Sequence, residues 1–279
     1  MTTPFETVRS ADGTPIAFER SGEGPPVVLI GGAFSSRAGA IGLALVLAPH
    51  FTAVTYDRRG RGDSGDSDHH AVEREIEDLT AVIESFGGRA GVFGHSSGAI
   101  LALEAARAGA PIDRLVAYEP PYIPEGYPRP GADLAARLRA LVAVGRRDDA
   151  VALFQTEAIG IPAAAVEAFR RTEVWPGLVA LAHTLPYDVD ITGPGNLLPA
   201  DRLARIAVPT LVIVGTSSLP WMLPGTRAVA AAIPGAHHLE LAGEDHGTPH
   251  HHPEVLLAPL LDFFSSPDRT SPARAASFS

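Results

Sequence analysis

The sequence of 279 residues predicts an α/β fold in which a mostly parallel, eight-stranded sheet is flanked by helices. Short apolar runs alternate with helix-like segments up to residue 118, and the same alternation resumes after residue 204. Between residues 124 and 204 the alternation stops, and apolar side chains recur at helical spacing. We therefore expect a core made of residues 1–123 and 205–264, interrupted by a helical insertion.

The expected strands are short and largely apolar. They cover residues 7–9, 16–19, 27–30, 52–56, 91–93, 115–118, 210–214 and 238–241. Helix-like segments cover residues 38–48, 72–86, 97–107, 226–232 and 253–264. The pair Asp12-Gly13 separates the first two strands and is typical of a hairpin turn. Alternating strands and helices elsewhere favour parallel pairing with helices on both faces.

The expected insertion, residues 124–204, has apolar residues at helical spacing, such as Leu134, Leu138 and Leu141. Proline-rich sequence precedes it, and Gly193-Pro194-Gly195 lies near its end. The polar, proline-containing tail at residues 265–279 is expected to be disordered.

Composition excludes several classes of function. A net charge of −10 argues against nucleic acid as a partner, because phosphate binding needs concentrated positive charge. No apolar run approaches the ~20 residues of a membrane span, and residues 1–10 lack the features of a signal peptide. Without cysteine, disulfides, a thiol nucleophile and thiolate metal sites are excluded. We expect a cytoplasmic protein, a monomer or homodimer, that acts on a small molecule.

The segment Gly94-His95-Ser96-Ser97-Gly98 lies between an expected strand and an expected helix. This is the context of a nucleophile elbow, in which a serine on a strained turn projects its hydroxyl into a pocket. Glycines two residues before and after the serine let the strand and the helix approach closely. Ser96 is therefore the predicted nucleophile.

A serine hydroxyl is a weak nucleophile near neutral pH, so Ser96 requires a base within hydrogen-bond reach. Among eleven histidines, His246 is the predicted base because it lies in the loop after the last expected strand. The alternative is a solvated loop histidine. His95, inside the elbow, is expected to shape the pocket wall rather than to transfer protons.

The oxyanion formed when Ser96 attacks a carbonyl needs two backbone donors. Ser97 N–H is one candidate, because it follows the nucleophile at a helix N-terminus. Ala33 N–H is the other, in the loop Gly31-Gly32-Ala33-Phe34 after the third strand. The alternative is that these glycines only form a turn.

Five motifs occur in the order found in the α/β-hydrolase fold, which this chain resembles over residues 5–264. They lie at residues 31–34, 56–64, 94–98, 208–215 and 243–247. The resemblance implies a cap inserted after the sixth core strand and a structural role for Asp57 and Arg58 in the second motif. The first motif begins with Gly31, where His-Gly is the commoner start.

The catalytic acid departs from the usual pattern of this family. Most relatives have an aspartate at the position of Ser218, after the seventh strand, and a serine cannot stabilise an imidazolium as a carboxylate does. Glu119 ends the sixth strand, where some relatives, including certain haloalkane dehalogenases and lactone hydrolases, place their acid. We predict Glu119 as the acid. The alternatives are Asp245, Glu244, or no acid, with Glu119 forming an ion pair at the start of the cap.

Substrate contacts are expected from Gly32, Phe34 and His95 around the elbow, and from Trp221 and Met222 in the loop that lacks the usual acid. Other apolar cap residues are expected mainly to pack the cap onto the core. The run His250-His251-His252 is interpreted as solvated, because consecutive residues cannot converge on one ion. We predict neither a metal nor a cofactor.

The predicted activity is that of a serine hydrolase cleaving a small, neutral or apolar carboxylic ester or lactone through an acyl-enzyme on Ser96. Two alternatives remain open. The same triad supports carbon–carbon bond hydrolysis and perhydrolysis, and the missing aspartate is also compatible with a non-catalytic ligand-binding homologue.

Overall fold

The computed structural model describes residues 5–67 and 69–266 and contains the predicted eight-stranded sheet. The strands are β1 (Glu6–Arg9), β2 (Pro15–Ser21), β3 (Pro26–Ile30), β4 (Thr52–Tyr56), β5 (Ala90–His95), β6 (Ile112–Tyr118), β7 (Thr210–Gly215) and β8 (His237–Leu241). Their order across the sheet is β1-β2-β4-β3-β5-β6-β7-β8. Each expected strand is present, with ends that differ by up to three residues.

The sheet is mostly parallel, as expected. Only β2 runs antiparallel to its neighbours, β1 and β4. In the parallel part, Ile30 pairs with Gly94, His95 with Tyr118, and Tyr118 with Ile213. The loops that follow β3, β5, β6 and β7 therefore leave the sheet at the same edge, which is where ligands bind in open parallel sheets.

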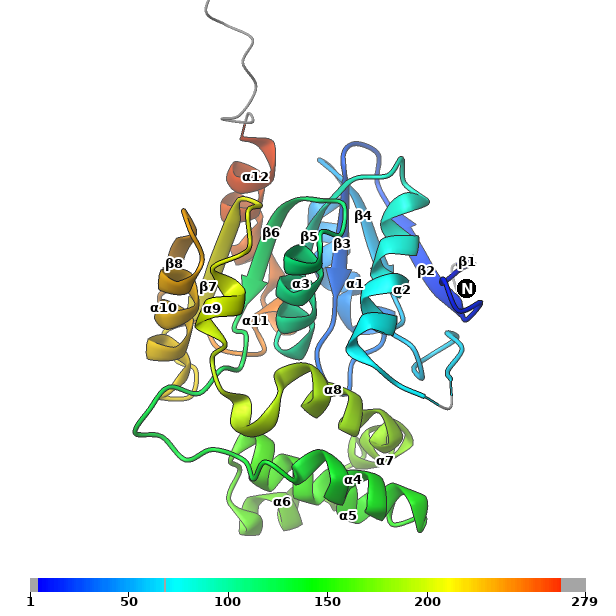
Figure 1. Ribbon diagram of the computed structural model, residues 1–279, viewed down its shortest axis with the longest axis vertical. Helices are drawn as coiled ribbons and strands as arrows, with labels where there is room; N and C mark the ends of the chain where they lie inside the picture. The colour runs from blue at the N-terminus through cyan, green and yellow to red at the C-terminus, as the bar shows by residue number, and fades with distance from the viewer. Residues whose placement is uncertain (1–4, 68, 267–279) are drawn as a thin grey trace, which may run out of the picture.

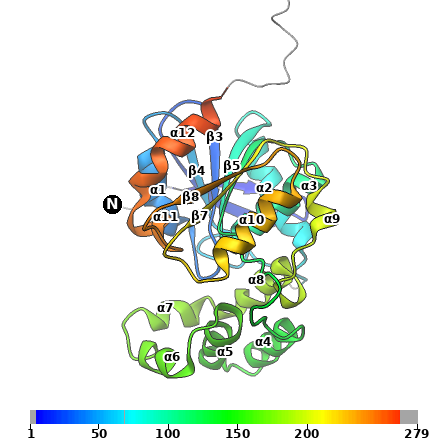
Figure 2. The same cartoon turned by 90° about the vertical axis from the view of Figure 1, so that its left-hand side faces the viewer.

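Helices cover both faces of the sheet, as Figure 2 shows. One face carries α1 (Ile41–Leu47), α11 (Thr248–His251) and α12 (Leu257–Ser265). The other carries α2 (Val72–Glu84), α3 (Ser97–Ala108), α9 (Ala200–Leu203) and α10 (Met222–Ala232). Two clusters of buried apolar side chains, one on each side, fill the space between sheet and helices. The predicted helix at 253–264 is divided into a 3-10 turn at Pro253–Leu256 and α12, because Pro259, in the first turn of α12, has no N–H to donate to the carbonyl four residues earlier.

The chain between β6 and β7 is helical and lies beyond the carboxyl ends of the strands (Figure 1). It contains α4 (Leu134–Ala143), α5 (Arg147–Phe154), α6 (Ala163–Phe169), α7 (Trp175–Ala180) and α8 (Leu185–Thr192) before α9. These helices enclose a third apolar cluster that includes Leu138, Val151 and Trp175. We call the segment between β6 and β7 the cap. That the cap begins at residue 124 and ends at residue 204 remains a prediction from the sequence.

Residues 265–279 are expected to form a disordered tail, and all of this tail after Ser266 lies outside the described residues. Among the helices of the described chain, none combines the length and the apolar character needed to cross a membrane.

Candidate active site

Ser96 occupies a sharp turn between β5 and α3. Its backbone has φ 57° and ψ −126°, which is unfavourable for any residue with a Cβ atom. The flanking glycines make this turn possible. A Cβ atom on Gly98 would lie 2.6 Å from the carbonyl oxygens of Ile30 and Gly31, and one on Gly94 would lie 2.5 Å from that of Gly98. The sequence thus folds as an elbow because no larger side chain fits at either glycine.

His246 lies in the loop after β8, and its Nδ1 is 2.6 Å from Oε2 of Glu119. The Glu119 side chain is completely buried, whereas His246 is partly exposed and lines a cavity together with Ser96. A carboxylate in this position accepts a hydrogen bond from Nδ1–H, so it holds Nε2 free to accept a proton. The structure therefore brings together the predicted nucleophile, base and acid at one end of the sheet.

The second carboxylate oxygen of Glu119 is held by the neighbouring strand end. Oε1 accepts hydrogen bonds from Gly215 N at 2.8 Å and from Ser218 Oγ at 2.6 Å. Ser218, at the position where most relatives have the acid, therefore contacts the Glu119 carboxylate directly. Two donors on one oxygen fix the orientation of the group and direct the other oxygen to His246.

The His246 loop is braced against the elbow at two points. The hydroxyl of Tyr118 donates to the Asp245 carbonyl at 2.6 Å, and Nε2 of His95 lies 2.9 Å from the His246 carbonyl. A backbone carbonyl only accepts hydrogen bonds, so Nε2 of His95 carries the proton. Burial, with added repulsion from His246 and His250, keeps the pKa of His95 well below its ordinary value. His95 is thus a neutral brace as well as a wall residue.

The loop after β3 approaches the nucleophile closely. A Cβ atom on Gly32 would lie 2.8 Å from Cβ of Ser96 and 3.3 Å from its hydroxyl oxygen, so only glycine fits there. Ala33 follows immediately, and Ser97 is the first residue of α3. Both predicted oxyanion donors thus belong to segments next to the Ser96 hydroxyl.

Backbone strain is concentrated around this point. Four residues other than glycine have positive φ in the described chain: Phe34, Ser96, Glu119 and Asn196. Three of them line the cavity, and the fourth, Glu119, contacts His246. Strained conformations persist where the surrounding structure imposes them, and they cluster at functional sites.

The cavity has a volume of about 480 Å³ and lies between the strand ends and the cap. The five residues predicted to contact substrate, Gly32, Phe34, His95, Trp221 and Met222, all line it, as do Ala33, Ser96, Ser97 and His246. The cap contributes a largely apolar wall that includes Phe154, Ile159, Ile161 and Val189. Phe34 meets Phe154 edge to face, with ring centroids 5.4 Å apart, which joins the loop after β3 to the cap.

Comparisons with known proteins agree with this architecture. Residues 27–258 match the alpha/beta hydrolase family. The chain belongs to that family. A crystal structure of an alpha/beta hydrolase from Sphaerobacter thermophilus is 51% identical, with a TM-score of 0.85 and coverage of 93% of this chain and 100% of that one. A comparison with curated proteins gives no match.

Two more distant structures share the hydrolase fold. An esterase from a Rhodococcus species is 20% identical, with a TM-score of 0.70 over 95% of this chain and 99% of that one. The enol-lactonase from Burkholderia xenovorans is 22% identical, with a TM-score of 0.65 over 94% of this chain and 100% of that one. At this identity the likeness extends to the fold alone.

Two ionisable residues that line this cavity, His250 and Asp188, were not among the site residues predicted from the sequence. His250 is exposed, as expected for its histidine run, but it also lines the cavity, and its ring lies 5.1 Å from that of His95. His250 is therefore solvated, as predicted, and it also faces the cavity, because the turn of α11 directs it back toward the elbow. The other residue is Asp188 of α8.

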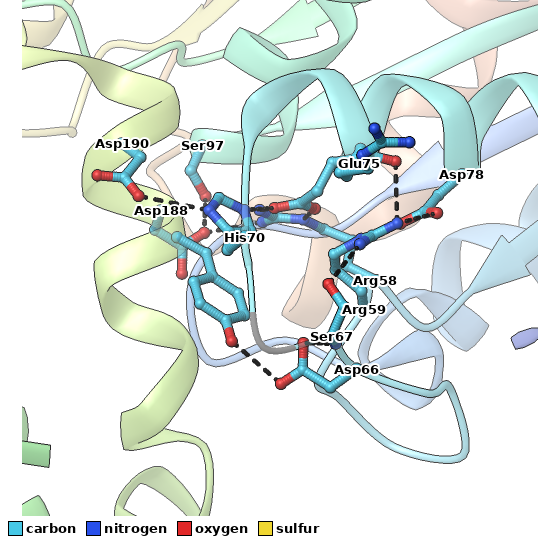
Figure 3. A network of polar contacts seen from close by, with 12 residues as sticks. Arg58, Arg59, Asp66, Ser67, His70, Glu75, Asp78, Ser97, Asp188 and Asp190 are labelled. Atoms are coloured by element: carbon cyan, nitrogen blue, oxygen red, sulfur yellow. Dashed lines mark hydrogen bonds and ion pairs between the residues drawn. The ribbon is translucent and has the colours of Figure 1, made fainter. Parts of the chain in front are cut away.

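Asp188 is a buried cap carboxylate that contacts the hydrolase core. Arg58 Nη1 donates to its Oδ1 at 2.8 Å, Arg61 Nη2 donates to its Oδ2 at 2.8 Å, and the Ser97 hydroxyl donates to its Oδ1 at 2.7 Å. Burial alone would raise the pKa of Asp188, but Arg61 and Arg58 lower it below its ordinary value. Figure 3 shows Asp188 beside Ser97 at one end of the polar network that contains Arg58 and Glu75.

This network anchors α8 to the core. Arg58 also forms a two-point ion pair with Glu75 of α2, at 2.6 and 2.9 Å, and both side chains are buried. Its position confirms the structural interpretation of Arg58. Asp57, also buried, accepts hydrogen bonds from the backbone N–H groups of Arg37 and Asp63 at 2.7 and 3.0 Å.

We expect α8 to exchange its amide hydrogens more slowly than α6, in which Val166 is the one buried residue. Asp188→Asn weakens the two buried ion pairs that Asp188 forms with Arg58 and Arg61. Removing one partner of a buried ion pair costs about 3–5 kcal/mol of stability, so the rate of amide hydrogen exchange in α8 should rise at least ~10²-fold. Hydrogen exchange measured by mass spectrometry on both helices checks this. Equal exchange in α8 and α6 of the unsubstituted protein would contradict the anchoring.

No group of three His, Asp or Glu side chains among residues 5–67 and 69–266 is arranged to hold a metal ion.

Proposed function

We propose that this alpha/beta hydrolase is a serine hydrolase that cleaves a carboxylic ester or lactone, with Ser96 as nucleophile, His246 as base and Glu119 as acid. The observation that carries the proposal is the 2.6 Å contact between His246 Nδ1 and the buried Glu119 carboxylate, behind a cavity that Ser96 lines. A buried carboxylate paired with a histidine beside an elbow serine is the arrangement that activates a hydroxyl.

In the proposed reaction, His246 Nε2 takes the proton of the Ser96 hydroxyl as Oγ attacks the carbonyl carbon. Glu119 stabilises the imidazolium that forms. The N–H groups of Ala33 and Ser97 stabilise the oxyanion, aided by the positive end of α3. Protonation of the leaving alkoxide by His246 yields the acyl-enzyme, and water activated by the same histidine then releases the acid.

The cavity favours a small, neutral or apolar substrate. Its cap wall is mostly aliphatic and aromatic, and its one buried carboxylate, Asp188, is paired with two arginines. A charged substrate would lose its hydration without gaining an unpaired partner of opposite sign. Cytoplasmic location and a monomeric or homodimeric state belong to the same proposal and rest on the sequence alone.

Two measurements test the proposal. A fluorophosphonate probe should form an adduct that peptide mapping places on Ser96, and p-nitrophenyl esters of short to medium acyl chains should be hydrolysed. Absence of an adduct on Ser96 would overturn the proposed nucleophile. An adduct together with turnover of diketones or peroxide, but not of esters or lactones, would instead support carbon–carbon bond hydrolysis or perhydrolysis by the same residues.

A further inference from the structure

Arg61 is a buried arginine that contacts the loop next to the nucleophile. Only 1% of its surface is exposed, and its Nη1 donates a hydrogen bond to the carbonyl oxygen of Gly32 at 2.5 Å and to that of Ser35 at 3.3 Å. The side chain comes from the turn after β4, so it reaches the loop after β3 from a neighbouring strand.

The contact between Arg61 and the Gly32 carbonyl affects the direction in which the Ala33 N–H points. The carbonyl of Gly32 and the N–H of Ala33 belong to one peptide bond, which is trans, as are all peptide bonds in the described chain. In a trans peptide the two groups point in opposite directions in one plane. When Arg61 holds the carbonyl, it therefore directs the Ala33 N–H to the opposite side of that peptide.

The same guanidinium is linked to the second proposed donor. Arg61 Nη2 forms bonds of 2.9 and 2.8 Å with the two oxygens of Asp188, and Asp188 Oδ1 accepts the Ser97 hydroxyl at 2.7 Å. Ser97 is the first residue of α3, so this contact fixes the start of the helix whose first N–H is the other donor. One chain of contacts, Gly32–Arg61–Asp188–Ser97, thus joins both sides of the expected hole.

We propose that Arg61 is a positioning residue that preorganises the oxyanion hole, by orienting the Gly32–Ala33 peptide directly and Ser97 through Asp188. The inference rests on the proposed function, because it presumes that an oxyanion forms at Ser96. Preorganised donors stabilise the transition state more than the ground state, so the loss of Arg61 lowers kcat rather than substrate affinity.

Arg59 provides a matched control from the same turn. It is also fully buried, and it forms a two-point ion pair with Asp78, with both bonds at 2.7 Å. Its further contacts are to Asp12, Ser67 and the Arg74 carbonyl, none of which lines the active-site cavity. Figure 3 shows Arg59 beside Asp78 and Ser67, away from Ser97. Loss of either arginine removes a buried ion pair, but only Arg61 contacts the proposed hole.

The experiment compares Arg61→Met, Arg61→Lys, Arg59→Met and the unsubstituted protein, at a temperature below the unfolding transition of each. The rate at which a fluorophosphonate labels Ser96 is the first readout, because its phosphoryl oxygen occupies the hole and the assay needs no knowledge of the natural substrate. The separate kcat and KM values for a p-nitrophenyl ester are the second.

Arg61→Met is expected to slow labelling and kcat about 10²-fold while KM changes less than about threefold, as for loss of one oxyanion donor. Arg61→Lys keeps the charge but cannot span Gly32 and Asp188 with a planar fork, so we expect a loss of about tenfold and a smaller fall in melting temperature than in Arg61→Met. Arg59→Met should lower the melting temperature and leave both rates within about twofold.

Wild-type labelling rates in Arg61→Met would overturn the inference, and if that variant does not fold, a wild-type rate in Arg61→Lys would do the same. Equal rate losses in Arg61→Met and Arg59→Met would also overturn it, because the effect would then be general destabilisation. Failure of the unsubstituted protein to label at Ser96 is a different result, and it would contradict the proposed function itself.

Discussion

Replacing Ser96 by glycine should lower ester hydrolysis about 10⁶-fold and, at the same time, raise the free energy of unfolding by about 1 kcal/mol. The loss of activity follows from the loss of the hydroxyl. The gain in stability follows from the backbone, because φ 57° with ψ −126° strains a residue with a Cβ atom but not glycine. The function of the protein is thus expected to cost it stability at this position.

Ser96→Ala is the control that separates the two effects. It also lacks the hydroxyl, so its activity should be equally low, but it keeps a Cβ atom in the strained turn. Chemical denaturation of both variants measures the difference in unfolding free energy. A glycine variant no more stable than the alanine variant would show that the turn stores no strain.

Replacing Glu119 by glutamine should reduce kcat about 10⁴-fold with little change in fold, since the two side chains have nearly the same shape. Gly215 N and Ser218 Oγ both donate to Oε1, so the amide oxygen would take that position and the NH₂ group would face His246. An NH₂ donor would force the histidine into the tautomer with Nε2 protonated. That tautomer cannot accept the proton of Ser96.

The matched control is Ser218→Ala, which removes one of the two donors that orient the carboxylate and should reduce kcat only about tenfold. Steady-state kinetics of both variants with one p-nitrophenyl ester give the comparison. Full activity in Glu119→Gln would contradict the role of Glu119. It would indicate that another carboxylate is the acid, or that the activity does not depend on a triad. The two other acids considered have different partners, since Glu244 contacts Thr248 and His252, and Asp245 accepts the Gly247 N–H.

The positions of the strands along the chain and of the elbow were predictable because each depends on local sequence. Buried strands leave apolar runs, and the spacing of Gly94 and Gly98 around Ser96 has a local steric cause. Glu119 could be selected because the residue that ends one parallel strand lies beside the residues that follow its neighbour. The resemblance to the alpha/beta hydrolases showed that Ser218, after the seventh strand, stands where a catalytic aspartate is usual, and so directed attention to the end of the sixth strand.

The contribution of Asp188 could not be predicted in the same way. It lies in a cap helix, 91 residues after Ser97, and nothing in the local pattern of α8 distinguishes it from Asp190, which contacts Arg139 and His70 instead. His250 was missed for a related reason, because its direction depends on a one-turn helix that short sequence patterns do not define. Contacts between separate elements decide both cases.

The anchoring of α8 by Asp188 also bears on how substrate reaches Ser96. A cap that opened as one rigid lid would have to separate Asp188 from two buried arginines, which makes such opening rare. A second cavity of about 510 Å³, which α8 does not line, shares Ala158, Ile159, Leu219 and Trp221 with the active-site cavity. We therefore expect substrate and product to pass between the turn that follows α5 and the loop that precedes α10, while α8 stays in place as the fixed wall of the site.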